Sequence, residues 1–504
     1  MKTKSVSLNI LTNIISKLLT VFFAVLIPKL YIDYFGSEVN GLIFSVAGIF
    51  VYINLLEAGI GAASIQALYK PISERNQKKI NGILSATDTY YKKAGIYFLA
   101  CLSIVIFLYP LLIETPISFF TIVMVILLSG ISSFLSFFIQ GKYNVLLHAD
   151  NKFYILTTIS TVSNLLSNII RIVLIIQGYD VITVQATFAL VSILQLLAVH
   201  RYVKKRYPEV SFKAIPDNLA ISQKSSVMVH QIAGVIFANT DVLIISAFLG
   251  LKEASVYMIY NMIFMQAGFL PNILATSLTA GLGQLYTENQ KKFKSIYNFF
   301  EVYYIAIACS VLTTAYLLIL PFLEIYTANV EDIEYLDAYL AVLFFVVNIL
   351  SAVRWPSVLL VTITGHFSQT KVSAIIEMVL NIVLSLSLVF YWGVYGVLFA
   401  SLVALLFRTA DIILYTNRQI LVQSSWITFR RLLYNVFFTL VIIYIFAGIE
   451  LSFDSYLEFV LIGGVLLFVL TVLYCVVNSI FEKDARVVLN SYMLMIWRKI
   501  FSMV

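Results

Sequence analysis

Long runs of apolar residues, separated by short polar breaks, repeat along the whole chain. The first run covers residues 8–32 and is long enough to cross a bilayer as a helix. It ends at residues 33–42, where glycines and acidic or amide residues predict a short, wet turn. A second run at residues 43–68 leads to a basic loop at residues 70–79. The chain is therefore predicted to begin with a hairpin of two membrane-spanning helices.

The pattern continues and predicts an all-α integral membrane protein with about 14 transmembrane helices. An even number of crossings places both termini on one side of the membrane. The expected spans are residues 8–32, 41–66, 93–113, 117–140, 154–177, 181–200, 226–249, 254–283, 297–322, 338–363, 372–392, 394–416, 432–449 and 457–480.

Composition and charge agree with this topology. Of the 504 residues, 61% are apolar and 12% are charged, and the mean hydropathy is +0.95, so lipid is the expected solvent. Nearly all of the 33 Lys and Arg residues lie in alternate loops, on the side of the N-terminus, and Lys252 is the exception on the other side. The positive-inside rule then places both termini in the cytoplasm. This distribution also argues against nucleic acid as the reason for the net charge of +7.

A repeat divides the chain into two similar halves. Tyr-Phe-Gly at residues 34–36 matches Phe-Leu-Gly at residues 248–250, and Asn-Gln-Lys-Lys occurs at residues 76–79 and again at residues 289–292. We therefore expect two pseudo-symmetric six-helix lobes at residues 1–200 and 226–416, joined by a cytoplasmic linker at residues 201–225. Helices 13 and 14 follow at residues 417–480, and a cytoplasmic amphipathic tail follows at residues 481–504.

Five basic residues remain inside the expected spans, although each such residue adds roughly 3 kcal/mol to the cost of insertion at a helix centre. All five are candidates for a substrate-binding cavity: Lys17, Lys29, Arg171, Arg354 and Arg408. Two have simpler explanations, because Arg408 lies three residues before Asp411 and Lys29 is close enough to an outer helix end to reach the surface. Lys17, Arg171 and Arg354 have no such explanation and favour a water-filled cationic cavity.

Acidic residues inside the spans are candidates for coupling or gating: Glu57, Asp241, Glu377 and Asp411. Glu377 belongs to a polar stripe with Asn381 and Ser385, which predicts a helix face turned away from lipid, although amide and hydroxyl groups there also serve as contacts between helices. Lys29 and Asp241 occupy equivalent heights in the two halves and are predicted to pair when an outer gate closes. The alternative is that Asp241 bonds only within its own half.

Several kinds of chemistry lack their usual residues. No Gly-x-x-x-x-Gly-Lys-Ser/Thr loop for ATP occurs, the four histidines lie in separate regions, and the three cysteines fall in apolar runs at unrelated spacings. The longest outer loop, around residues 323–337, is too short for a glycosyl-transfer domain. We therefore expect neither an enzyme nor a metal site, and no cofactor other than a coupling H⁺ or Na⁺.

Two stretches resemble signatures of a known family. Phe-Gly-Ser-Glu-Val-Asn-Gly-Leu at residues 35–42, followed by Leu-Glu-Ala-Gly-Ile-Gly-Ala at residues 56–62, looks like the N-terminal signature of bacterial polysaccharide repeat-unit flippases. These are the O-antigen and capsule transporters (Wzx-like) of the MATE-like MOP superfamily. Residues 239–250 with Tyr257 resemble the matching signature of the second lobe. The sequence departs from the family where Glu57 replaces a more usual Asp and where Ala-Ser-Val occupies residues 254–256.

The resemblance implies a bacterial plasma-membrane flippase. Such proteins move undecaprenyl-diphosphate-linked oligosaccharides from the inner to the outer leaflet by alternating access around a cationic cavity, driven by a proton or sodium gradient. Membrane lipid, polysaccharide polymerase and chain-length proteins are the candidate partners. The alternatives are a lipid II flippase of the same superfamily, a MATE-type multidrug exporter and a membrane glycosyltransferase or polymerase.

Overall fold

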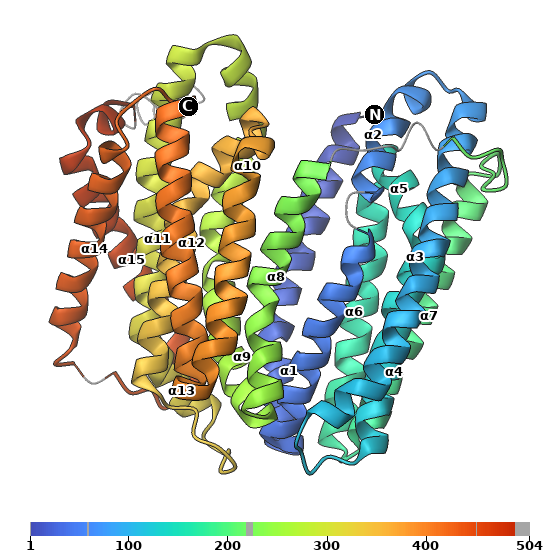
Figure 1. Cartoon of the computed structure of the whole chain (residues 1–504), viewed down its shortest axis with the longest axis horizontal. Coiled ribbons are helices and arrows are strands. Elements are labelled where there is room, and N and C mark those ends of the chain that lie inside the picture. Colours follow the sequence, from blue (N-terminus) through green and yellow to red (C-terminus); the bar gives the residue numbers. More distant parts are fainter. Residues whose placement is uncertain (1, 58–59, 218–224, 450, 489–504) are drawn as a thin grey trace, which may run out of the picture. The chain divides into compact units, whose positions relative to one another are not determined.

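The computed structural model describes residues 2–57, 60–217, 225–449 and 451–488, and all regular structure in these ranges is helical (Figure 1). Eleven helical segments there are long and apolar enough to cross a membrane. Two of them, residues 15–57 and 367–420, contain 43 and 54 residues. At about 1.5 Å per residue, each is long enough to cross a bilayer of about 30 Å twice. The predicted all-α membrane fold with about 14 crossings is confirmed.

The chain forms two compact units. The first contains the described parts of residues 1–258 together with residues 330–333. Its helices are α1 (Lys2–Ile53), η1 (Asn54–Glu57), α2 (Ile60–Ser73), α3 (Gln77–Leu112), α4 (Phe119–Leu135), η2 (Ser136–Gln140), α5 (Gly141–Ala149), α6 (Phe153–Ile176), α7 (Val181–Arg206), α8 (Ser225–Phe248) and the first half of α9 (Leu251–Ala267). Because α8 packs on α1, it groups with this unit.

The second unit contains the described parts of residues 259–329 and 334–504. After α9, its helices are α10 (Phe269–Glu288), α11 (Gln290–Tyr326), α12 (Ala338–Thr364), α13 (Phe367–Tyr415), η3 (Thr416–Ile420), α14 (Trp426–Phe446) and α15 (Tyr456–Phe481). Helix α11 lies at its centre and packs on α10, α12, α14 and α15.

Single glycines turn the chain inside the two longest helices. Gly36 in α1 has a φ of +82° and Gly393 in α13 has a φ of +55°, a region that favours glycine because it has no Cβ. The turn predicted within residues 33–42 is present, but it is confined to Gly36, and its expected contact with water is wrong. Ser37 and Asn40 are buried, and they bond to Asp332 and Ser255 within the first unit.

The repeat seen in the sequence has the same local geometry in both halves. Asn76 and Asn289 are the N-caps of α3 and α11, and their side chains accept hydrogen bonds from the backbone N–H groups of Lys79 and Lys292 at 3.1 and 3.0 Å. Gly250, the counterpart of Gly36, also has a positive φ, of +103°. The pseudo-symmetry therefore extends to the glycine turns and to the caps that start α3 and α11.

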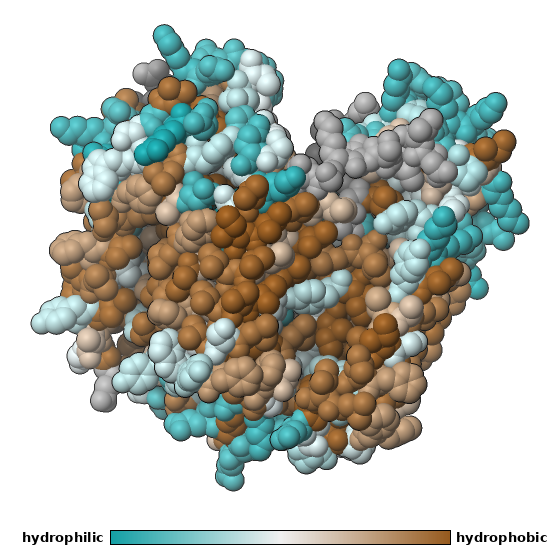
Figure 2. Space-filling view, viewed as in Figure 1, coloured by the Kyte–Doolittle hydropathy of each residue, from teal (hydrophilic) through white to brown (hydrophobic). Residues whose placement is uncertain are grey.

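Hydrophobic side chains cover the middle of the helices on the face shown in Figure 2, and hydrophilic side chains gather at the helix ends. On α15, Val460, Val465 and Phe468 are all more than 60% exposed, as expected for a helix solvated by lipid. The predicted lobe boundaries stay predictions. Helix α7 continues to Arg206, inside the predicted linker, and most of the predicted tail at residues 481–504 lies outside the described ranges.

Candidate functional site

Four charged side chains meet in the second unit. Arg354 lies on α12, and Glu377 lies on the first half of α13. Because α13 turns at Gly393, its second half brings Arg408 and Asp411 to the same place. Arg354 Nη1 donates to Glu377 Oε1, and Arg408 Nε lies 3.6 Å from Glu377 Oε2. Arg408 Nη1 also donates to Asp411 Oδ2 at 3.0 Å, which confirms the predicted pairing of these two residues.

The cluster is deeply placed and electrically balanced. Side-chain exposure is 5% for Arg408, 10% for Glu377, 20% for Arg354 and 34% for Asp411. Two guanidinium groups face two carboxylates, so their formal charges cancel. A buried charge is tolerated when it is paired and hydrogen-bonded, and both arginines meet that condition through acids. Arg354 and Arg408 therefore form one site around Glu377 rather than two separate cations.

The polar stripe of α13 that contains Glu377 is turned away from lipid, as predicted. Glu377, Asn381 and Ser385 are all buried, and Asn381 Nδ2 donates to Ser401 Oγ at 2.8 Å. Other polar atoms of this helix pair are buried without a hydrogen-bond partner in the described part of the chain: Trp355 Nε1, Ser385 Oγ and Thr409 Oγ1. Buried groups of this kind usually bind water or a ligand, so the region suits a polar occupant.

The first unit has a separate cavity of about 610 Å³, and the predicted residue Glu57 lines it. Its walls come from η1, the start of α2 and α8: Asn54, Leu55, Glu57, Gly61, His230, Gln231, Gly234, Val235, Ala238 and Asn239. The Tyr91 hydroxyl donates to Glu57 Oε1. Gly61 leaves room for this contact, because a Cβ there would lie 3.2 Å from the Tyr91 oxygen. The cavity thus combines amide groups and His230 with the Glu57 carboxylate, which the Tyr91 hydroxyl holds in position.

The other predicted basic residues of the first unit lie apart. Arg171 Nη2 donates to Gln185 Oε1 at 3.3 Å, and its guanidinium stacks 4.4 Å from the centre of the Phe188 ring. It also interacts electrostatically with Tyr31 of α1, whereas Lys17 is exposed fourteen residues earlier on that helix. A separation of about 21 Å along α1 follows from the helical rise. A single cavity shared by Lys17, Arg171 and Arg354 stays a prediction.

Lys29 and Asp241 each have a partner close by in the sequence. Lys29 Nζ forms an ion pair with Asp33 at 2.7 Å, one helical turn away. Asp241 is buried and accepts a hydrogen bond from the Tyr257 hydroxyl at 3.1 Å. The proposed pairing of Lys29 with Asp241 during gating stays a prediction.

The sequence analysis missed a buried ionic network on the second unit. Glu301 on α11 is 1% exposed and accepts from Arg431 Nη1 on α14, while Arg431 Nη2 donates to Glu482 at 3.1 Å. Arg430 also donates to Glu482, at the end of α15. A single acid in the apolar run at residues 297–322 was the available signal. The network ties α14 and α15 to α11.

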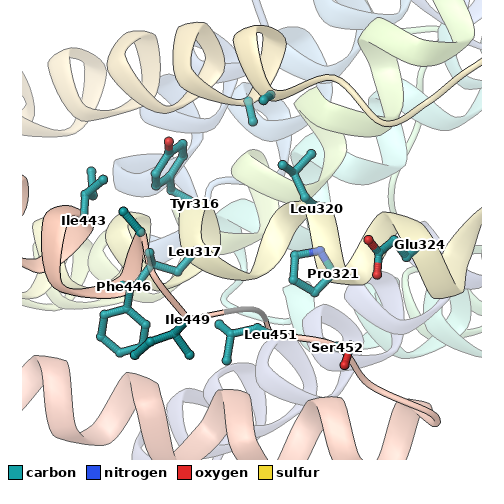
Figure 3. Close-up of a pocket in the computed structure, with 13 residues that line it drawn as sticks. Tyr316, Leu317, Leu320, Pro321, Glu324, Ile443, Phe446, Ile449, Leu451 and Ser452 are labelled. Carbon is teal, nitrogen blue, oxygen red and sulfur yellow. The ribbon is translucent and has the colours of Figure 1, made fainter.

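Another cavity, in the second unit, lies between α11, α12 and α14 (Figure 3). Its volume is about 610 Å³, and most of the residues that line it have apolar side chains. Tyr316, Leu317 and Leu320 of α11 face Phe446 of α14 and Leu451 of the following loop. No basic residue lines this cavity in the described part of the chain, so it suits an apolar chain better than an anion.

Comparison with known proteins identifies the fold. No protein-family model matches the chain, and no curated protein sequence matches it significantly. Among solved structures, one of the lipid II flippase MurJ in an inward closed conformation is similar, with a TM-score of 0.66 and 15% identity over 94% of this chain and 99% of that one.

Two transporters of the MOP superfamily also match. An inward-facing multidrug resistance MATE transporter has a TM-score of 0.61 and 14% identity, over 79% of this chain and 94% of its own. A transporter from Pyrococcus furiosus, described as having a binding pocket of reverse polarity, has a TM-score of 0.55 and 13% identity, over 84% of this chain and 97% of its own. The chain has the MOP fold.

Proposed function

We propose that the protein is a flippase that moves undecaprenyl-diphosphate-linked oligosaccharide from the inner to the outer leaflet, for capsule, O-antigen or related polysaccharide synthesis. The observation that carries this proposal is the convergence of Arg354 and Arg408 on Glu377 inside the membrane-spanning part of the second unit. Guanidinium groups donate paired hydrogen bonds to neighbouring phosphate oxygens, which suits a diphosphate. The MOP fold supports transport as the activity.

An apolar surface for the lipid tail supports the same proposal. A polyprenyl chain needs an apolar path beside the polar headgroup site. The cavity in Figure 3 and the lipid-facing side chains of α15 offer such surfaces within the second unit. The ionic network around Glu301 would hold α14 and α15 in place beside them.

A lipid II flippase is the second candidate, because it acts on the same diphosphate-linked lipid class. The likeness to the MurJ structure over 94% of this chain favours it. A multidrug exporter is less well supported, since we expect a cation site to present unpaired acids, and Glu377 is paired with two arginines.

The proposal also includes the orientation in the membrane, the coupling ion and the protein partners. We place both termini in the cytoplasm of a bacterial cell, with Glu57, Asp241, Glu377 and Asp411 as candidates for coupling to H⁺ or Na⁺ or for gating. The polysaccharide polymerase and chain-length proteins would receive the exported units.

Export in a strain that lacks the chromosomal copy tests the function. We expect Arg354→Ala to reduce surface polysaccharide, Arg354→Lys to reduce it less and Arg354→Glu to abolish it, with unchanged protein levels in the membrane. Lys78→Ala, at an exposed cation of α3, is the matched control and should export normally. Normal export by an Arg354→Ala/Arg408→Ala double variant would contradict the proposal. Rescue of cells depleted of their lipid II flippase would favour the second candidate.

A further inference from the structure

Glu377 occupies the hydrogen-bonding positions that an anionic substrate would need. Arg354 Nη1 faces one oxygen of its carboxylate, and Arg408 Nε faces the other. A carboxylate and a phosphate accept the same charge-assisted hydrogen bonds from guanidinium groups. With the acid in place, the cluster has no net charge to attract a diphosphate. An anion can use the two arginine donors that now face Glu377 only if Glu377 gives them up.

We propose that Glu377 takes the place of a substrate phosphate in the empty transporter, and that a bound diphosphate displaces it while the displaced carboxylate takes up one proton from solvent. This rests on the proposed function. The proton follows from charge balance, because a displaced carboxylate that stayed ionised would leave an unpaired charge beside a new anion inside the protein.

The charged neighbours of Glu377 support displacement and protonation of this residue rather than of another acid. In the described part of the chain, α13 packs on α12 and η3, and Arg418 of η3 is exposed. His366, at the turn between α12 and α13, bonds to Tyr415. Among the described residues, Arg354 and Arg408 pair with Glu377, and Asp411 pairs with Arg408. Asp411 is 34% exposed and contacts only one of the two arginines, so it can keep Arg408 as its partner after the displacement.

The exchange also gives a route for release. Two guanidinium groups on one diphosphate would hold it tightly, which slows departure into the second leaflet. A carboxylate that returns to the arginines and loses its proton competes with the diphosphate and lowers its affinity. The proton leaves on the same side as the lipid, so this step by itself draws no energy from an inward proton gradient.

Binding of a defined lipid to the purified full-length protein tests this exchange. The probe is undecaprenyl diphosphate linked to a single N-acetylglucosamine, a diester whose phosphates stay ionised near neutral pH. Intrinsic tryptophan fluorescence, to which Trp355 beside Arg354 contributes, is the readout. For the natural protein, the Kd should fall as pH falls, by at most about tenfold per pH unit if one proton is taken up. Glu377→Gln should bind more tightly, by at least about tenfold at alkaline pH, and without pH dependence.

Glu288→Gln, at an exposed carboxylate of α10, is the control and should keep the pH dependence. Calorimetry of the natural protein in two buffers with different ionisation enthalpies should show uptake of one proton, which tests the idea even if Glu377→Gln does not fold. Binding without proton uptake, or a Glu377→Gln variant as pH-dependent as the natural protein, would overturn the exchange and leave the flippase function intact. Failure of the natural protein to bind the lipid at any pH would instead count against the proposed function, and with it the exchange.

Discussion

Replacing Glu301 should lower the free energy of unfolding of the second unit more than a surface substitution does. Its carboxylate accepts from Arg431 Nη1 and from the Thr428 hydroxyl at 3.1 Å, and the side chain is almost fully buried. In Glu301→Ala, Arg431 keeps Glu482 at 3.1 Å and Asn298 at 2.9 Å, so its charge stays partly compensated. Breaking a buried ion pair lowers the free energy of unfolding by about 3–5 kcal/mol, and we expect the lower end of that range.

The assay is thermal unfolding of the purified protein in detergent. A loss of about 3 kcal/mol corresponds to a fall of roughly 6–12 °C in Tm for a unit of this size. Glu74→Ala is the control, because Glu74 lies 3.8 Å from Lys70 on the surface and such pairs contribute about 0.5 kcal/mol or less.

The double variant Glu301→Leu/Arg431→Met gives the sharper result. It removes both charges, and Glu482 keeps Arg430 as a partner. Replacing both members of a buried pair by apolar groups is often close to neutral, so the double variant should be more stable than Glu301→Ala. A Tm shift for Glu301→Ala no larger than that of the control, or a double variant less stable than Glu301→Ala, would refute the reasoning.

Two further predictions concern topology and packing. Single cysteines at the exposed positions Glu114 and Glu331 should react with an impermeant thiol reagent in intact cells, whereas cysteines at Lys78 and Lys291 should react only after lysis; the opposite pattern would reverse the orientation. Gly41→Ala should prevent accumulation of folded protein, because the new Cβ would lie 1.8 Å from the Leu251 carbonyl oxygen, while Gly464→Ala, with open space around it, should accumulate normally; equal membrane levels of the two variants would show that this contact can relax.

Local rules predicted the features that depend on neighbours in the sequence. The span pattern follows from hydrophobic length, and the pair Arg408–Asp411 follows from a spacing of three residues on one helix. The repeated Asn at residues 76 and 289 caps a helix in both halves. The buried stripe of Glu377, Asn381 and Ser385 follows from helical periodicity.

Features that depend on distant partners were missed or misread. The polar residues at 33–42 suggested contact with water, but Ser37 bonds to Asp332, 295 residues away, so a polar turn became a packed one. The turn at Gly393 was expected between the spans at 372–392 and 394–416, but the span pattern does not say which side chains the turn brings together. Only this turn brings Arg408 onto Glu377, so the central contact of the candidate site could not be read from spacing alone.

The number of basic residues in the spans is therefore a poor measure of how cationic a cavity is. Lys29 has Asp33 as a partner, and Arg354 and Arg408 share Glu377, so at least three of the five have acids beside them. Arg171 uses an amide and an aromatic ring, which supply no formal negative charge. A charge-balanced cluster attracts an anion only when one acid leaves or is neutralised. Substrate charge and proton uptake then become linked quantities, and measuring one without the other would misjudge how tightly the site holds its lipid.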